Sequence, residues 1–182
     1  MRHHLARAAL FCRITRLHLA FKGWNLLESV NWTWGLLLIA LTVAIHAAGV
    51  VMMAFVGFGI RARLETRTLG LRHVIPLVIG IVGAVALLLA VLHGIEATIW
   101  AAAYVWLGAL DSPQDAILYS IDSMATRGAS GLMLHQHWRM MGALEAAGGM
   151  LLFGISTAYI FAVMQGYWPM LSGLFVARCH PP

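Results

Sequence analysis

The chain has 182 residues, of which 61% are apolar and only 10% are charged, and its mean hydropathy is +0.82. A soluble domain carries about a quarter charged residues, so this composition excludes a soluble globular protein and indicates an integral membrane protein. The formal net charge is +5, but the basic residues are grouped in two blocks, so no nucleic-acid partner is expected. The sequence contains no phosphate-binding loop, metal-ligand cluster or nucleophile beside a base, so we expect no enzymatic activity.

Residues 1–33 form the first basic block and are expected to be a separate segment. Four apolar residues are spaced to fall on one helical face, namely Leu10, Ile14, Leu17 and Phe21. This spacing predicts an amphipathic helix lying on the membrane surface, and a basic tail without fixed structure is the alternative.

Two transmembrane helices are expected next. Trp34 to Phe58 contains no charged residue, and at about 1.5 Å per residue it exceeds the hydrocarbon thickness of about 30 Å. We therefore predict a first span over residues 34–59, followed by a basic loop over 60–73. Val74 to Trp106 is predicted to form the second span, which stays apolar until His93 and Glu96.

The stretch from Ser112 to Gly131 has a different pattern. Ser112 provides a hydroxyl cap, Pro113 suits the first helical position, and Asp115 follows in the first turn. The predicted helix, residues 112–125, is apolar but shorter than the roughly 20 residues that cross a bilayer. Backbone that turns inside a membrane must be surrounded by protein or by a water-filled cavity, so we expect a re-entrant helix and loop.

This segment resembles the tetrameric potassium-channel superfamily, whose pore helix leads into a filter of the form T-x-T-T-V-G-Y-G-D. The matching residues here run from Ser123 to Gly131, S-M-A-T-R-G-A-S-G. Thr126 and Gly128 occupy the family's last threonine and first glycine positions. The resemblance covers residues 74 to about 165, so it extends from the second span to the last one.

The resemblance implies an all-α membrane protein with three transmembrane helices, a re-entrant pore helix and a filter loop, closed as a homotetramer in a cell (inner) membrane. The pore domain would cover residues 74–166, with the filter at 126–131 and a tail at 167–182. The implied function is conduction of monovalent cations, with a filter that faces outward and basic residues 61–72 in the cytoplasm. A non-conducting accessory or structural protein derived from such a pore is the alternative.

Besides Arg127, three filter residues depart from the family pattern. Thr126 and Gly128 would keep their cation-binding and backbone roles. Ser130 replaces the second glycine and adopts a positive φ less readily, while Ala129 removes the bulk of the family's tyrosine. Gly131 takes the place of the aspartate. We therefore expect weak potassium selectivity or none.

Arg127 stands where the family has valine, and it allows two interpretations. Four guanidiniums facing the axis of a tetramer would repel cations strongly, even at a local dielectric constant of about 20. A side chain turned into the protein would instead need an acid, because an unpaired buried charge is costly in a membrane. The candidate partners, which would also support the filter, are Asp122, Glu96 and Glu145.

Other residues on the spans have open roles. Gly148 and Gly149, in the predicted last span from Met140 to about Gln165, would act as a gating hinge or permit close helix packing, as would Gly154. His46 lies mid-span and is expected to bond a neighbour on its own helix. His93 and Glu96 are three apart on one helix face, which indicates either a proton-sensitive pair or a locally satisfied hydrogen bond. His135 and His137 form an H-x-H pair without a third ligand. We predict no structural metal and no cofactor.

Overall fold

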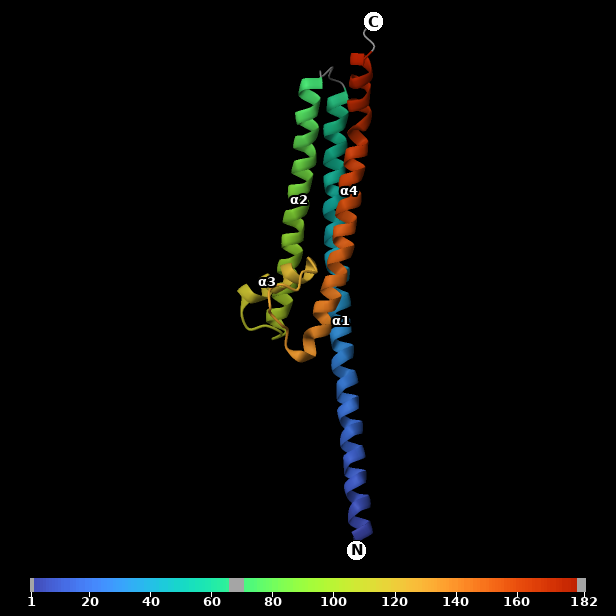
Figure 1. Cartoon of the computed structure of the whole chain (residues 1–182), viewed down its shortest axis with the longest axis vertical. Helices are drawn as coiled ribbons and strands as arrows, with labels where there is room; N and C mark the ends of the chain where they lie inside the picture. Colours follow the sequence, from blue (N-terminus) through green and yellow to red (C-terminus); the bar gives the residue numbers. More distant parts are fainter. Residues whose placement is uncertain (1, 66–70, 180–182) are drawn as a thin grey trace.

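The computed structural model describes the backbone of residues 2–65 and 71–179 and the side chains of residues 30–64 and 72–172. This part of the chain is helical, and Figure 1 shows the helices in chain order. The elements are α1 (Arg2–Glu65), α2 (Leu71–Trp106), α3 (Pro113–Met124), the 3₁₀ turn η1 (Gln136–Trp138) and α4 (Arg139–Cys179). The all-α class expected from the sequence is confirmed for the described residues.

Three of these helices are long and apolar enough to cross a membrane. The candidate spans are Val30–Leu64, Arg72–Trp106 and Gln136–Ser172. Large apolar side chains face outward on all three, including Phe55, Leu87 and Met150. Such outward apolar surface is what lipid contact requires, so the chain is a multi-pass membrane protein. The two ends of the chain lie at opposite ends of the bundle, as three spans require (Figure 1).

The helix boundaries differ from the sequence prediction at both ends of the chain. α1 has 64 residues and is therefore about 96 Å long, continuing unbroken across the boundary expected at residue 33. Its N-terminal part extends beyond the rest of the bundle (Figure 1). The amphipathic face predicted there lies outside the described side chains. At the other end, α4 continues to Cys179, so most of the expected tail is helical.

The short helix α3 begins as its sequence predicts. Ser112 is the N-cap, and its hydroxyl oxygen accepts a hydrogen bond from the backbone N–H of Asp115 at 3.3 Å. Pro113 takes the first helical position, where its missing N–H costs nothing. α3 has 12 residues and is about 18 Å long, which is too short to cross a bilayer.

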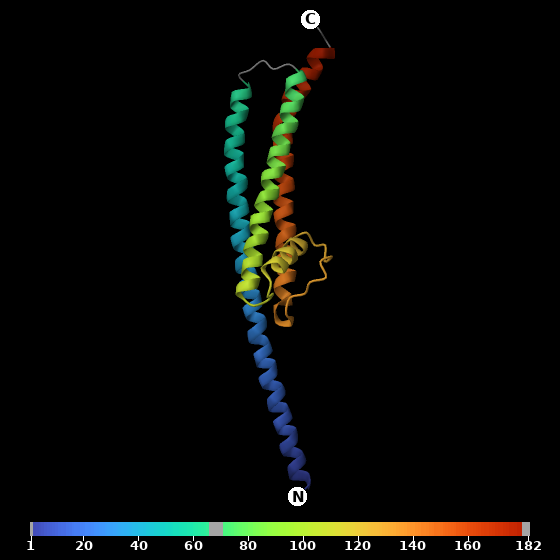
Figure 2. The same ribbon diagram turned by 90° about the vertical axis from the view of Figure 1, so that its left-hand side faces the viewer.

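A buried apolar cluster holds α3 at the end of the bundle where α2 stops. It includes Trp100 and Tyr104 of α2 and Met141 of α4, packed with Ala116 of α3 and Leu134 of the loop before η1. Figure 2 shows α3 and the loop after it projecting from one side of the bundle beside α4. The packing therefore places the predicted filter residues next to the first turns of α4.

Candidate functional site

The loop after α3 contains the predicted filter residues, and its backbone is unusual. Thr126, Gly128 and Gly131 all have positive φ, at 54°, 59° and 70°. The two glycines adopt this left-handed conformation at little cost, whereas a threonine seldom does. Gly128 thus has the unusual backbone expected of it, and its part in a filter stays a prediction. The left-handed conformation of Thr126 was not expected. Ser130, at the family's second glycine position, does not have a positive φ, and the next residue, Gly131, has one instead.

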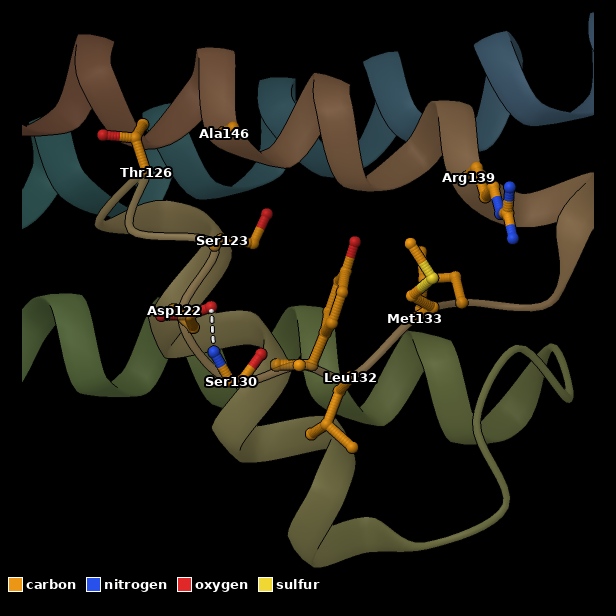
Figure 3. Close-up of a pocket in the computed structure, with 12 residues that line it drawn as sticks. Asp122, Ser123, Thr126, Ser130, Leu132, Met133, Arg139 and Ala146 are labelled. Carbon is orange, nitrogen blue, oxygen red and sulfur yellow. Dashed lines mark hydrogen bonds between the residues drawn. The ribbon is translucent and has the colours of Figure 1, made fainter.

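Asp122 fixes the shape of this loop. Its buried carboxylate accepts a hydrogen bond from the backbone N–H of Ser130 at 3.0 Å, drawn as a dashed line in Figure 3. The backbone N–H of Arg127 donates to the Asp122 carbonyl oxygen at 3.0 Å. The hydrogen bond from Ser130 lowers the pKa of the Asp122 carboxyl, because it favours the charged form. One residue near the end of α3 thus ties both arms of the loop together.

Arg127 is held only loosely. Its side chain is 69% exposed in the single chain, and its Nε lies 3.9 Å from Oδ1 of Asp122. Of the three acids proposed as partners, Asp122 alone comes within 4 Å of the guanidinium in the described part of the chain. The proposed pairing with Glu96 or Glu145 is wrong for this chain, since both acids bond other groups. An exposed pair at this distance contributes little stability.

Glu145 connects three helices rather than pairing with Arg127. Its Oε2 accepts a hydrogen bond from the Tyr104 hydroxyl of α2 at 2.7 Å, and its Oε1 bonds the Ser120 hydroxyl of α3. Ser120 Oγ also lies 2.9 Å from the carbonyl oxygen of Ala97, to which it can donate. We call Glu145, Tyr104 and Ser120 the Glu145 cluster, and all three are fully buried.

Proton counting suggests how the Glu145 cluster is satisfied. Ser120 has one hydroxyl proton but faces two oxygens. All the groups are satisfied if Ser120 donates to the Ala97 carbonyl and a protonated Glu145 donates to Ser120 Oγ. The sequence analysis missed both Tyr104 and Ser120, whose only signal was that they are polar residues in apolar stretches.

Gly149 allows α3 to approach α4 closely. A Cβ atom at this position would overlap the backbone of Met124, the last residue of α3. One at Gly148 would meet Cγ1 of Ile39 at 3.2 Å, whereas nothing lies within 4 Å of the position at Gly154. This geometry assigns a packing role to Gly149. The gating hinge proposed at Gly148 and Gly149 stays a prediction, and α4 is continuous through both residues.

A cleft of about 490 Å³ lies between α3, the loop and the start of α4. Figure 3 shows Asp122, Ser123 and Thr126 on the α3 side, with Met133 and Arg139 at the opposite end. Its lining also includes the left-handed glycines Gly128 and Gly131, the small residue Ala146 of α4, Ser130 and Leu134. Polar side chains therefore lie at both ends of the cleft, with Asp122, Ser123 and Thr126 at one end and Arg139 at the other.

The two buried or half-buried histidines on the spans, His46 and His93, differ in how they are satisfied. His46 bonds residues of other helices: its Nδ1 is 2.9 Å from Oε1 of Glu96 on α2, and its Nε2 is 3.0 Å from Oγ of Ser156 on α4. The expectation that His46 bonds a neighbour on its own helix is therefore wrong. His93 does have the local partner expected, because its Nδ1 lies 2.8 Å from the carbonyl oxygen of Leu89.

His135 and His137 lie near the end of the loop, before α4. Both are exposed, and their rings stack with centroids 6.5 Å apart. No third ligand joins them among the side chains that the structure describes. The pair therefore stays a weak candidate for metal binding.

The likeness to potassium channels rests on the residues of α3 and its loop alone. No family model, curated protein or solved structure matches this chain.

Proposed function

We propose that the chain is the pore-forming subunit of a tetrameric, potassium-channel-like ion channel that passes cations with little or no selectivity for potassium. One observation carries the proposal: a capped 12-residue helix, placed between two membrane-spanning helices, leads into a loop with left-handed residues at Thr126 and Gly128. This arrangement coincides with the residues that resemble a channel filter.

Helix length supports a re-entrant path for this segment. α2 and α4 each qualify as a span, so the residues between them begin and end on one side of the membrane. α3 is apolar on one face and too short to cross, yet it packs against both spans through Ala116 and Ser120. The proposed path enters the bilayer along α3 and returns along the loop, shielded from lipid by protein.

The electrostatics of the loop favour cations. The C-terminal end of α3 has the negative end of the helix dipole, and the Asp122 carboxylate lies in its last turn. Carbonyl oxygens near Thr126 and Gly128 would replace part of the hydration shell of an ion. Ala129 supplies no aromatic brace, and Ser130 is not left-handed, so a rigid series of potassium sites is not proposed.

Closure of the pore requires several copies of the chain. One loop cannot enclose a channel, and the family resemblance implies fourfold symmetry. Thr126, Arg127, Gly128 and Ala129 are all exposed in the single chain, so they are free to face a common axis. The proposed assembly is a homotetramer in a cell membrane.

Arg127 favours the alternative of a pore that does not conduct. Its guanidinium is 69% exposed beside the filter loop. Four such groups at the axis would repel cations and one another. In that case the protein would be an accessory or structural relative of a channel, with Arg127 as a plug.

Planar-bilayer recordings of the purified protein test these two functions. We expect a tetramer by native mass measurement and, for the wild type, a reversal potential that barely responds to exchange of K⁺ for Na⁺. Replacing Arg127 by Val should raise cation conductance about tenfold, which corresponds to removing a repulsion of about 1.4 kcal/mol, while Arg127→Lys should stay near the wild type. A silent wild type with a conducting Arg127→Val variant would identify the plug. A stable monomer would end the channel proposal.

A further inference from the structure

Three side chains with metal-binding atoms meet within the membrane-spanning bundle, and none of them belongs to α3 or its loop. His46 comes from α1, and His93 and Glu96 come from successive turns of α2. One ligand atom of each lies within 4.8 Å of the other two. His46 and Glu96 are fully buried, and His93 is half-buried. We call these three residues the metal triad.

The hydrogen bond of His93 sets its tautomer. A carbonyl oxygen only accepts, so the contact between His93 Nδ1 and the Leu89 carbonyl places a proton on Nδ1. Neutral imidazole then carries its lone pair on Nε2. This atom is buried and has no hydrogen-bond partner. Metal-binding histidines commonly have this arrangement, in which the outer N–H donates to a carbonyl oxygen and the inner nitrogen faces the ion.

Glu96 and His46 complete the same pattern. Glu96 Oε1 contacts His46 Nδ1, but Glu96 Oε2 is buried without any partner. His46 Nε2 faces Ser156 Oγ on α4. With a proton on Nε2, His46 donates to Ser156 and turns the Nδ1 lone pair toward the other two ligands. Each histidine thus has an acceptor for its outer N–H, as metal sites require.

We propose that His46, His93 and Glu96 bind one divalent transition-metal ion between α1 and α2, with Ser156 of α4 orienting His46. Two imidazole nitrogens and one carboxylate oxygen suit zinc and its neighbours in the first transition row, whereas magnesium and calcium prefer oxygen ligands. Ligand atoms about 2.1 Å from a tetrahedral ion are about 3.4 Å apart. The three ligand atoms lie within 4.8 Å of one another, so side-chain rotation would need to shorten their separations by at most roughly 1.4 Å.

The bound ion would have two consequences. It would link α1 to α2 and, through Ser156, hold α4 against both. Three protein ligands also leave a fourth position for water or another small ligand, as in open zinc sites. The proposal is independent of ion conduction by the loop, because no residue of the metal triad belongs to the loop or its cleft.

The competing explanation is a metal-free hydrogen-bond chain from Ser156 through His46 to Glu96. That chain accounts for both nitrogens of His46. It leaves His93 Nε2 and Glu96 Oε2 without a partner at the same place, whereas a metal ion would satisfy both. Buried polar atoms in native proteins are nearly always satisfied, so the two orphaned atoms favour the metal.

The test is metal binding by the full chain, purified without a polyhistidine tag and treated with chelator. The purified protein is titrated separately with Zn²⁺ and Co²⁺, and bound metal is measured by mass spectrometry after gel filtration. We expect one ion per chain and, for Co²⁺, visible absorption bands of a four- or five-coordinate site. His93→Gln and Glu96→Gln should each weaken binding at least about 100-fold. Ser156→Ala should weaken it about 10- to 100-fold, because it removes only the acceptor for His46.

The exposed pair His135 and His137 provides the matched control. A double change of both to Gln removes two imidazoles, more than any single variant of the metal triad, but should leave one bound ion per chain. Circular dichroism and gel filtration check that each variant keeps its helices and its oligomeric state, and Ser156→Ala carries the test if a ligand variant does not fold. Absence of bound Zn²⁺ and Co²⁺ in the wild type would overturn the proposal. Binding that survives in Glu96→Gln but is lost in the control would overturn it as well.

Discussion

Two buried carboxyl groups lie in the membrane-spanning helices, and their surroundings differ. Glu145 has a partner for each oxygen, in Tyr104 and Ser120. Glu96 has His46 on one oxygen and nothing on the other, and the unpartnered Nε2 of His93 is close by. Both carboxyl groups are fully buried, so burial alone does not distinguish them. The number of satisfied atoms does.

This difference indicates that Glu145 belongs to a structural site, whereas Glu96 belongs to a site that can bind a ligand. In the Glu145 cluster every polar side-chain atom has a partner, and the bonds join α2, α3 and α4 into one unit beside the filter loop. The metal triad has ligand atoms to spare. An unsatisfied polar atom is more costly in a membrane than in water-exposed protein, since no solvent is available to replace the partner. Its presence in two side chains at once indicates a missing partner.

The largest expected effect comes from removing the carboxyl group of Glu145. Glu145→Leu should lower the free energy of unfolding by about 2 to 4 kcal/mol, because two hydrogen bonds are lost and the buried Tyr104 hydroxyl is left without an acceptor. Glu145→Gln should cost less than about 1 kcal/mol, since the amide oxygen accepts from Tyr104 and its NH₂ group donates to Ser120. Unfolding in mixed micelles, followed by circular dichroism, measures both.

Substitution of Glu96 tests the difference between the two buried carboxyl groups. In chelator-treated protein, Glu96→Gln should also preserve stability, yet it should abolish metal binding.

Equal loss of stability in Glu145→Leu and Glu145→Gln would mean that a charged carboxylate, rather than a set of hydrogen bonds, holds α3. The two clusters would then differ less than their geometry indicates.

A smaller effect is expected at Gly149, where α3 meets α4 by close approach instead of hydrogen bonding. Gly149→Ala should destabilise the fold by about 1 to 3 kcal/mol, because the new methyl group overlaps the Met124 backbone. Gly154→Ala is the matched control, since its surroundings are open. It should be neutral or stabilising by up to about 1 kcal/mol. If unfolding measurements show Gly154→Ala to be more destabilising than Gly149→Ala, a hinge is favoured over a packing role at Gly149.

The smallest effect concerns Asp122, a third carboxyl group, which lies in the last turn of α3. The hydrogen bond from Ser130 lowers its pKa in the folded chain, so it contributes stability above the ordinary aspartate pKa of about 3.9. This contribution disappears as the pH falls from that value through the lower folded pKa. Thermal unfolding between about pH 5 and pH 3 should therefore show a weaker loss of stability in Asp122→Asn than in the wild type. Identical pH profiles would show that the contact with Ser130 does not hold the loop.

The amino-acid sequence by itself determined the membrane class, the three spans and the position of α3. These features depend on local chemistry. A run of apolar residues long enough to cross lipid requires no partner to be recognised, and the cap formed by Ser112 and Pro113 acts within one helical turn. The left-handed backbone at Gly128 was also predictable, because glycine adopts it at the lowest cost.

Only the tertiary structure decided which polar groups meet. Glu96 and Glu145 were candidate partners of Arg127 beside Asp122, whereas the structure joins Glu96 to His46, and Glu145 to Tyr104 and Ser120. The unbroken length of α1 and the packing role of Gly149 also came from the structure. The physical reason is that contacts between helices depend on how each helix is rotated and shifted against the next. Spacing along one chain gives the face of a residue but not the helix that this face meets.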